Sequence, residues 1–194
     1  MLMQLMDQLR EQVTTDEVGV MIKKFNPRLS LGQNRQVMRE ESTAPYSCFI
    51  DDDDLLSPLY ISRILPLLDG VDQVGFNVKC FCDQAEIGIA YHSIKNANWF
   101  ETPRNGRHGS KPGLFRDISH INPIKRELAL KCKMEGDVGE DCRWANEMRK
   151  LGIVKTEHYV DEILYFYLWR GKKNDAIDHQ NPFRLRMIET LKRP

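Results

Sequence analysis

The chain has 194 residues, 41% of them hydrophobic, and its 28 basic and 28 acidic side chains give a formal net charge of zero. That length and hydrophobic share can bury one substantial core, and no shift in composition along the chain indicates a second one. The balanced charge excludes a global electrostatic attraction to nucleic acid or to an anionic membrane, while local charged patches remain compatible with it.

The number of cysteines and the first residues of the chain indicate the cellular compartment. The five cysteines are an odd number without a repeated CxxC pair, which argues against a disulfide framework or a structural zinc site. The apolar start carries Asp7 and Arg10, unlike a signal peptide or a membrane span. We therefore expect a cytoplasmic protein with no membrane partner.

The first half of the chain alternates between helical and strand periodicity, which is typical of an α/β fold. Helices are predicted over residues 2–13, 33–41 and 57–68. Strands are predicted over residues 17–22, 46–50, 73–82 and 86–91.

The second half is less regular. Residues 95–116 are predicted to form a loop, and helices are predicted over 123–132 and 140–151. The aromatic stretch 159–170 is interpreted as core or as an oligomer contact. We expect one domain over residues 1–170, followed by a polar tail, 171–194, with a short helix near its end.

Four consecutive aspartates, Asp51–Asp54, follow the apolar residues 46–50. Adjacent carboxylates repel one another, and a hard cation such as Mg²⁺ or Mn²⁺ is the usual way a fold converts that repulsion into binding. A solvated acidic loop or a helix N-cap is the alternative. The position after an apolar strand, where open α/β sheets bind their ligands, favours a site.

A second acidic pair, Glu140 and Asp141, begins a predicted helix. Carboxylates in the first turn complement the helix dipole, so capping is one interpretation. The other is a general base held on a rigid helix end, which needs hydrogen-bond reach to the acceptor hydroxyl. Spacing alone does not choose between the two.

Three segments together resemble family 2 glycosyltransferases with the GT-A fold. Residues 46–58 (YSCFIDDDDLLSP) resemble the strand, DxD motif and following helix of that family. Residues 139–152 (GEDCRWANEMRKLG) resemble its downstream ED motif, and residues 120–127 (HINPIKRE) are similar to a stretch of phage and giant-virus members. The resemblance covers about residues 1–170 and implies a GT-A-like mixed sheet flanked by helices.

The resemblance also implies roles for the acidic residues. Asp53 would bind Mn²⁺ or Mg²⁺ together with Asp51, while Asp51 and Asp52 would face the ribose or metal-bound water. Asp141 would be the base of an inverting displacement, and Glu140 would support it or contact the acceptor. The implied reaction moves a sugar from a nucleotide-sugar donor, expected to be a UDP-sugar, to a hydroxyl of a glycan or of a modified phage DNA base.

Other residues carry weaker signals. His158 and His179 lie downstream of the ED motif, where some GT-A enzymes recruit a third metal ligand, but no spacing rule selects either. The basic residues Arg104, Arg107, His108 and Lys111 either contact phosphates or a polyanionic acceptor, or form a solvated loop.

Asn34 and Arg35 match the place where such enzymes carry polar or basic residues near the nucleotide sugar, although Arg35 could equally lie on the surface. Trp144 either stacks on an acceptor sugar or belongs to the core. His120 either contacts the acceptor, a phosphate or the metal, or is a hydrogen-bonded structural residue.

The chain departs from the family at its start, because it opens in what resembles the first helix and the preceding strand is expected to be missing. Two alternatives therefore stay open. One is a metal-dependent nucleotidyl- or phosphotransferase, which would release pyrophosphate or phosphate. The other is a non-catalytic GT-A subunit that pairs an exposed sheet edge with a partner, including a second copy in a homo-oligomer.

Overall fold

The structure is a computed structural model that describes residues 2–96, 100–102, 113–169 and 182–191. Its centre is the long strand β3 (Gln73–Cys82), in which eight of ten residues are buried. β3 pairs antiparallel with β4 (Ala85–His92) and parallel with β8 (Glu157–Trp169), so it has neighbours along most of its length. Successive side chains of a strand point to opposite faces, and the face with Val74, Phe76 and Val78 joins the main core cluster, whereas the other face carries Gln73, Asn77 and Lys79.

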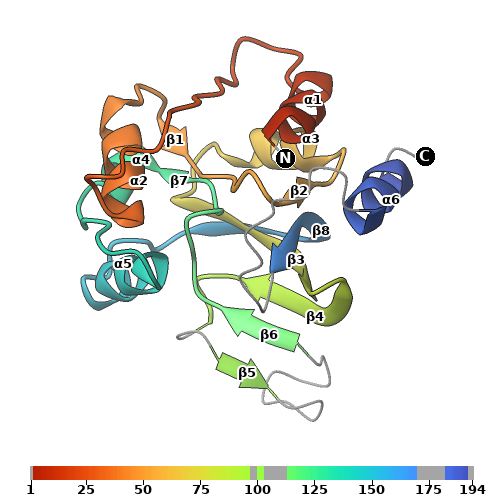
Figure 1. Cartoon of the computed structure of the whole chain (residues 1–194). Coiled ribbons are helices and arrows are strands. Elements are labelled where there is room, and N and C mark those ends of the chain that lie inside the picture. The colour runs from red at the N-terminus through yellow and green to blue at the C-terminus, as the bar shows by residue number, and fades with distance from the viewer. Residues whose placement is uncertain (1, 97–99, 103–112, 170–181, 192–194) are drawn as a thin grey trace.

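Shorter strands complete an eight-stranded mixed sheet among the described residues. β1 (Tyr46–Ser47) pairs with β7 (Ile124–Lys125), and β7 joins the beginning of β3. β2 (Leu55–Leu56) pairs with β8, while β6 (Gly113–Arg116) runs parallel to β4 and pairs with β5 (Phe100–Thr102). Figure 1 shows β4, β6 and β5 extending away from the helices.

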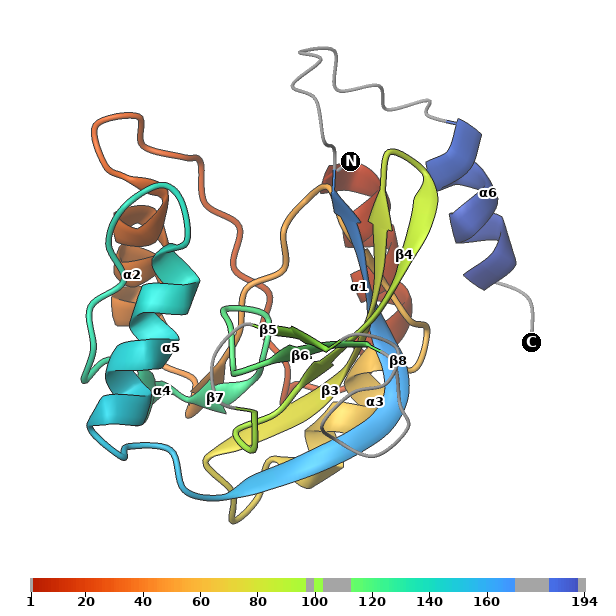
Figure 2. The same ribbon diagram turned by 90° about the horizontal axis from the view of Figure 1, so that it is seen from below.

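Helices flank the curled sheet in three groups (Figures 1 and 2). α1 (Leu2–Gln12) and α3 (Tyr60–Ile64), which continues as the 3-10 turn Leu65–Leu67, pack on β3 and β8. α2 (Leu31–Glu41), α4 (Arg126–Ala129) and α5 (Glu140–Lys150) lie together at another side, over a second cluster centred on Trp144. α6 (Pro182–Leu191) packs on a third cluster formed by Leu55, Phe81 and Phe166. No helix in the described part of the chain is both long and apolar enough to span a bilayer.

Several predicted elements are confirmed. The predicted helices 2–13, 33–41 and 140–151 correspond to α1, α2 and α5, and the predicted strands 73–82 and 86–91 form the β3–β4 pair. The aromatic stretch interpreted as core or as an oligomer contact is the strand β8, and its residues Leu164, Tyr165 and Phe166 are buried.

Other predicted elements are wrong or too long. Residues 17–22 form no strand, and the predicted strand 46–50 is a strand only at Tyr46–Ser47. The predicted helix 123–132 is reduced to α4 because Ile124–Lys125 pair with β1 as β7. The described parts of the predicted loop 95–116 contain β5 and β6.

Candidate functional site

The site forms where the start of α5, helix α2 and the acidic loop meet. α2 begins with a capping box in which the Ser30 hydroxyl accepts from the Gln33 amide at 3.2 Å and the Gln33 side chain accepts from the Ser30 amide at 2.9 Å. The same hydroxyl accepts from the Gly136 amide at 3.0 Å. A Cβ at Gly32 would lie 2.7 Å from the backbone of Glu135, so a glycine is needed for this close approach. The beginning of α2 is thereby fixed to the loop that leads into α5.

Arg35 connects the two acidic motifs. Its side chain, 7% exposed, points from α2 to Asp51 at 2.5 Å and also forms an ion pair with Glu140. These partners lie 16 and 105 residues away along the chain. A guanidinium can donate to two carboxylates at once because its N–H groups form a planar fork. Arg35 is therefore buried in a network that joins the two acidic motifs, and the alternative that it lies on the surface is wrong.

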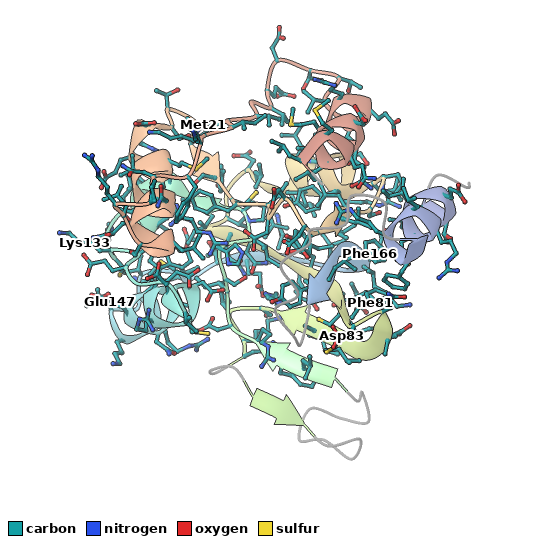
Figure 3. The ribbon with its side chains drawn as sticks, viewed as in Figure 1. Met21, Phe81, Asp83, Lys133, Glu147 and Phe166 are labelled. Atoms are coloured by element: carbon teal, nitrogen blue, oxygen red, sulfur yellow. The ribbon has the colours of Figure 1, made fainter. Side chains whose placement is uncertain are left out.

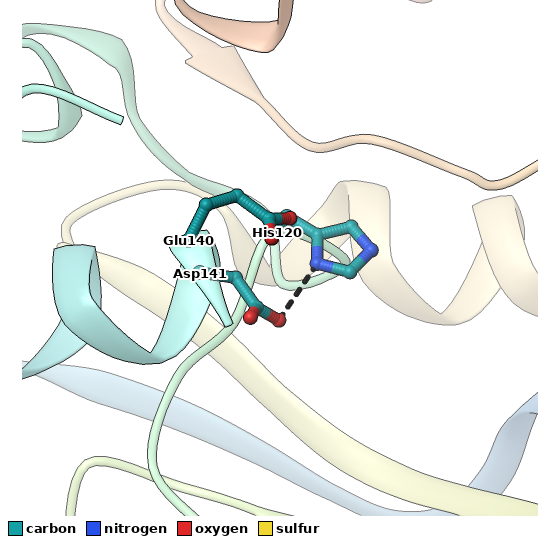
Figure 4. Close-up of side chains that lie close together, drawn as sticks. All are labelled: His120, Glu140 and Asp141. Carbon is teal, nitrogen blue, oxygen red and sulfur yellow. Dashed lines mark hydrogen bonds and ion pairs between the residues drawn. The ribbon is translucent and has the colours of Figure 1, made fainter. Parts of the chain in front are cut away.

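His120 forms a second bridge between the acidic motifs. Its Nδ1 lies 2.9 Å from a carboxylate oxygen of Asp141, and its Nε2 lies 3.2 Å from a carboxylate oxygen of Asp51. Figure 4 shows the imidazole beside the first turn of α5, with Glu140 and Asp141 on that turn. The backbone holds the bridge in register, because the His120 carbonyl accepts from the Phe49 amide at 2.8 Å, two residues before Asp51.

The bridge sets the charges of the cluster. Burial alone would lower the pKa of His120, but its hydrogen bonds to Asp141 and Asp51 outweigh burial and raise the pKa to about 9. Burial likewise opposes ionisation of Asp51 and Asp141, yet hydrogen bonding and the charge of His120 leave both pKa values lowered. Burial raises the pKa of Glu140, and the neighbouring Asp141 adds to that shift.

The four aspartates of the acidic run have different environments. Asp51 belongs to the network, Asp52 is exposed and Asp53 is half-buried. Asp54 is 1% exposed and accepts from the Tyr165 hydroxyl at 2.7 Å and from the Leu168 amide at 2.8 Å. Burial raises the pKa of Asp54 to about 8, with the charge of Asp53 adding to the effect. Asp54 thus anchors the acidic loop to β8, whereas Asp51 takes part in the network with Arg35 and His120.

Arg184 of α6 holds the acidic loop from the other side. Its guanidinium donates to the carbonyl of Asp53, to that of Asp54 at 3.0 Å and to that of Asp52 at 3.5 Å. Its Nε also donates to Gln4 of α1 at 2.8 Å. Sequence reasoning did not identify this residue, because a single arginine in a polar tail gives no local signal of a contact some 130 residues away.

One group in the described part of the chain has metal-ligating character. Ligand atoms of His120, Glu140 and Asp141 lie within 4.8 Å of one another. Carboxylate oxygens suit Mg²⁺ and Mn²⁺, and imidazole nitrogen suits Mn²⁺ and other transition metals. Asp51 is hydrogen-bonded to the same His120, so the donor set fits a divalent cation. The group differs from the predicted ligand pair Asp51 and Asp53, although Asp51 borders it.

Some predicted residues lie apart from this network. The Asn34 side chain closes the turn before α2 by bonding the backbone of Asn26, Leu29 and Ser30. Trp144 is 1% exposed and its indole N–H donates to the Ala129 carbonyl at 3.1 Å. The ring of Trp144 therefore packs in the core and is not accessible for stacking on an acceptor sugar in this structure.

Further candidates of the sequence lie elsewhere. His158, considered as a third metal ligand, is exposed and bonds the Leu67 carbonyl at 2.8 Å. The other such candidate, His179, lies outside the described residues, as do the basic residues Arg104, Arg107, His108 and Lys111.

Comparison with known proteins gives a structural likeness without a sequence match. No family model and no curated protein matches the chain. The structure is similar to the crystal structure of S. aureus TarS 1–349, with a TM-score of 0.56 and 12% sequence identity. The likeness covers 86% of this chain and 56% of that chain.

That likeness concerns the fold. The predicted fold class, a GT-A glycosyltransferase fold with a mixed sheet flanked by helices, is confirmed. The chain spans little more than half of the TarS chain that it matches, at 56%. Donor, acceptor, metal and the roles of the site residues stay predictions, and they are argued from geometry below.

Proposed function

We propose that this protein is a metal-dependent inverting glycosyltransferase that moves a sugar from a nucleotide-sugar donor to a hydroxyl acceptor. One observation carries the proposal. In a GT-A fold, the acidic run and the first turn of α5 belong to a single hydrogen-bonded network, joined through Arg35 and His120. Motifs about 90 residues apart in sequence thus lie side by side, as a transferase that must hold a donor and activate an acceptor requires.

Asp141 is the proposed general base. The acceptor oxygen attacks the anomeric carbon, the bond from that carbon to the diphosphate oxygen breaks with its electron pair, and the acceptor proton moves to the Asp141 carboxylate. His120 orients this carboxylate by its hydrogen bond to one oxygen, and the Cys142 amide donates to the other at 2.8 Å. The lowered pKa keeps Asp141 ionised at neutral pH, so it is ready to accept the proton.

The proposed ligands of Mn²⁺ or Mg²⁺ are Asp51 and Asp53, and His120, which contacts Asp51 and belongs to the metal-ligating group, is a further candidate ligand. A divalent cation would neutralise the charge that develops on the diphosphate leaving group. In the structure the positive charge among these carboxylates comes from Arg35 and His120. When these carboxylates bind the cation, Arg35 and His120 would be released to contact the donor phosphates.

For the donor and acceptor we retain the classes that the resemblance implies. The proposed donor is a UDP-sugar, contacted by Arg35, Asp51 and Asp52. The proposed acceptor is a hydroxyl of a glycan or of a modified phage DNA base, which approaches Asp141 and His120.

The test is turnover by Asp141→Asn with Mn²⁺ and a panel of sugar nucleotides. We expect release of nucleoside diphosphate to fall by at least about a thousandfold, because the amide cannot take the proton, while donor affinity changes by less than about threefold. Glu147→Gln, an exposed position on the same helix, is the matched control and should keep wild-type turnover. Normal turnover by Asp141→Asn would refute the assigned base, and release of pyrophosphate from a nucleoside triphosphate would indicate a nucleotidyltransferase instead.

A further inference from the structure

The segment between α1 and α2 exposes consecutive apolar side chains. Val20, Met21, Ile22 and Phe25 are 44%, 45%, 54% and 53% exposed. Figure 1 shows this stretch crossing from α1 to α2 along the periphery of the molecule, and Figure 3 places Met21 there. Isolated exposed apolar residues are ordinary, but three in a row on an extended chain are typical of a surface that another chain covers.

The backbone of this segment is also without partners inside the described chain. Residues 18–25 form no helix or strand there, and no hydrogen bond between backbone groups joins them to another described residue. Such N–H and C=O groups are satisfied by water or by a strand from a second chain. The β-branched sequence VGVMI favours the strand, which explains why local pattern predicts one where the isolated chain forms none.

Charge decides which partner fits. Residues 16–24 read DEVGVMIKK, with two acidic residues before the apolar centre and two basic residues after it. In an antiparallel pair of two identical segments centred on Val20, acidic residues of each copy lie opposite basic residues of the other. The facing pairs are Asp16 with Lys24, Glu17 with Lys23, Val18 with Ile22, Gly19 with Met21, and Val20 with itself. Asp16 and Glu17 form a turn in the single chain and would extend on pairing.

We propose that this protein forms a two-fold symmetric dimer in which residues 16–24 of two copies pair as antiparallel strands about Val20. The interface is isologous, so each favourable pair occurs twice. Opposite charges and apolar side chains directly across an antiparallel pair both stabilise it. All four charged residues are exposed. Lys23 forms an ion pair with Glu41, but the two side chains are 39% and 51% exposed, so replacing this pair by one with Glu17 of the second copy costs little free energy.

The proposal is independent of the proposed enzymatic function, and charge reversal tests it. Sedimentation velocity over a concentration series would compare the wild type with Glu17→Lys and with Lys23→Glu. Each variant alone places like charges opposite each other twice, and we expect its dimer dissociation constant to rise at least about tenfold. Lys133→Glu, an exposed reversal at a different surface shown in Figure 3, should dimerise as the wild type does.

The mixture of the two single variants gives the decisive result. Glu17→Lys presents lysines at 17 and 23, whereas Lys23→Glu presents glutamates at both, so the mixed dimer regains two favourable pairs. We expect the mixture, and the double variant by itself, to associate at nearly wild-type affinity. A wild type that stays monomeric at a protein concentration of about 100 μM would overturn the proposal. So would a dimer whose dissociation constant neither single reversal changes.

Discussion

Arg39 carries a positive charge into the core with aromatic rings as its neighbours. The side chain is 1% exposed, and its guanidinium carbon lies 5.0 Å from the centre of the Phe49 ring and 4.6 Å from a ring of Trp144. Its Nε donates to the Ser47 hydroxyl at 3.4 Å, but both terminal nitrogens are buried without a hydrogen-bond partner among the described residues. Burial lowers the pKa of Arg39 to about 10. The cation–π contacts are thus the main compensation for a costly burial.

This environment predicts that the volume of the side chain at position 39 contributes more to the stability of the fold than its charge does. Arg39→Met keeps the filled space and removes an unsatisfied charge, so we expect the free energy of unfolding to stay within about 1 kcal/mol of the wild type. Arg39→Ala leaves a cavity between Phe49 and Trp144 and should cost about 2–4 kcal/mol. Urea unfolding of both variants measures the difference. Equal losses in the two variants would show that the charge itself is required.

His120 gives the site a dependence on pH whose sign follows from its hydrogen bonds. The pKa is raised from 6.5 to about 9 in the folded protein, so the stabilisation is fully present below pH 6.5 and is lost as the pH rises through about 9. The shift corresponds to roughly 3 kcal/mol. Asp51 and Asp141 have lowered pKa values, so their contribution to the free energy of unfolding is present at neutral pH and is lost in acid.

We therefore expect the metal-free wild type to lose about 2–3 kcal/mol of unfolding free energy between pH 6.5 and pH 9.5, while His120→Gln loses far less over that range. Chemical denaturation at a series of pH values, with a chelator present, makes the comparison. His158→Gln, at an exposed histidine, is the control and should follow the wild-type curve. Parallel curves for wild type and His120→Gln would mean that the imidazole is not charged between the carboxylates.

Helix α6 shows how an element can matter to a site without a motif of its own. Its apolar residues Phe183 and Met187 pack on the cluster of Leu55, Phe81 and Phe166. That docking places Arg184 against the carbonyls of the acidic loop, on the side opposite Arg35. The division of the chain at residue 170 stays a prediction, but the described tail helix contributes to the support of the loop.

For Arg184→Met we expect a loss of about 2–3 kcal/mol in unfolding free energy, because carbonyls of the acidic loop lose a charged donor. Affinity for Mn²⁺ should also weaken severalfold, since the loop is less well fixed. Arg186→Met, at an exposed position on the same helix, should change neither quantity. Unfolding curves and metal titrations of the two variants give the answer, and an unaffected Arg184→Met would contradict the supporting role.

Element boundaries differ from prediction for identifiable reasons. The predicted helix 57–68 is divided because Pro66 lacks the N–H that an α-helix needs, and the chain continues as a 3-10 turn. The predicted strand 46–50 keeps only its first two residues in a ladder, after which Phe49 bonds the loop at His120 instead of a strand. Periodicity indicates which residues suit a strand, but a ladder also needs a neighbour at the right place.

At the scale of the molecule, the parallel pairing of β3 with β8 fixes the relation between the two acidic motifs. Gln73 pairs with Glu157 and Cys82 with Trp169, so residues more than 80 positions apart are paired, with the register shifting between Phe76 and Val78. β8 also supplies Tyr165, whose hydroxyl bonds Asp54 and the Asp51 amide. The sheet therefore holds the acidic loop, and α5 meets that loop at the edge of the same sheet.

Binding of the proposed ligands should stabilise this whole assembly. With Mn²⁺ and a matching sugar nucleotide at about 100 times the dissociation constant, we expect about 2.7 kcal/mol of added stability, or a rise of roughly 5–10 °C in Tm. Asp53→Ala should abolish the shift, and Asp69→Ala, at an exposed aspartate outside the site, should keep it. The absence of a shift with every donor in the panel would favour a non-catalytic GT-A subunit.

The sequence by itself determined the α/β class, the helices α1, α2 and α5, the β3–β4 pair and the acidic residues of the site. These follow from periodicity, capping and charge within windows of about ten residues. Only the tertiary structure decided that Arg35 and His120 join Asp51 to Glu140 and Asp141, that Trp144 is core, and that Arg184 supports the loop. Such contacts depend on strand register and helix docking between distant segments, which no local pattern specifies.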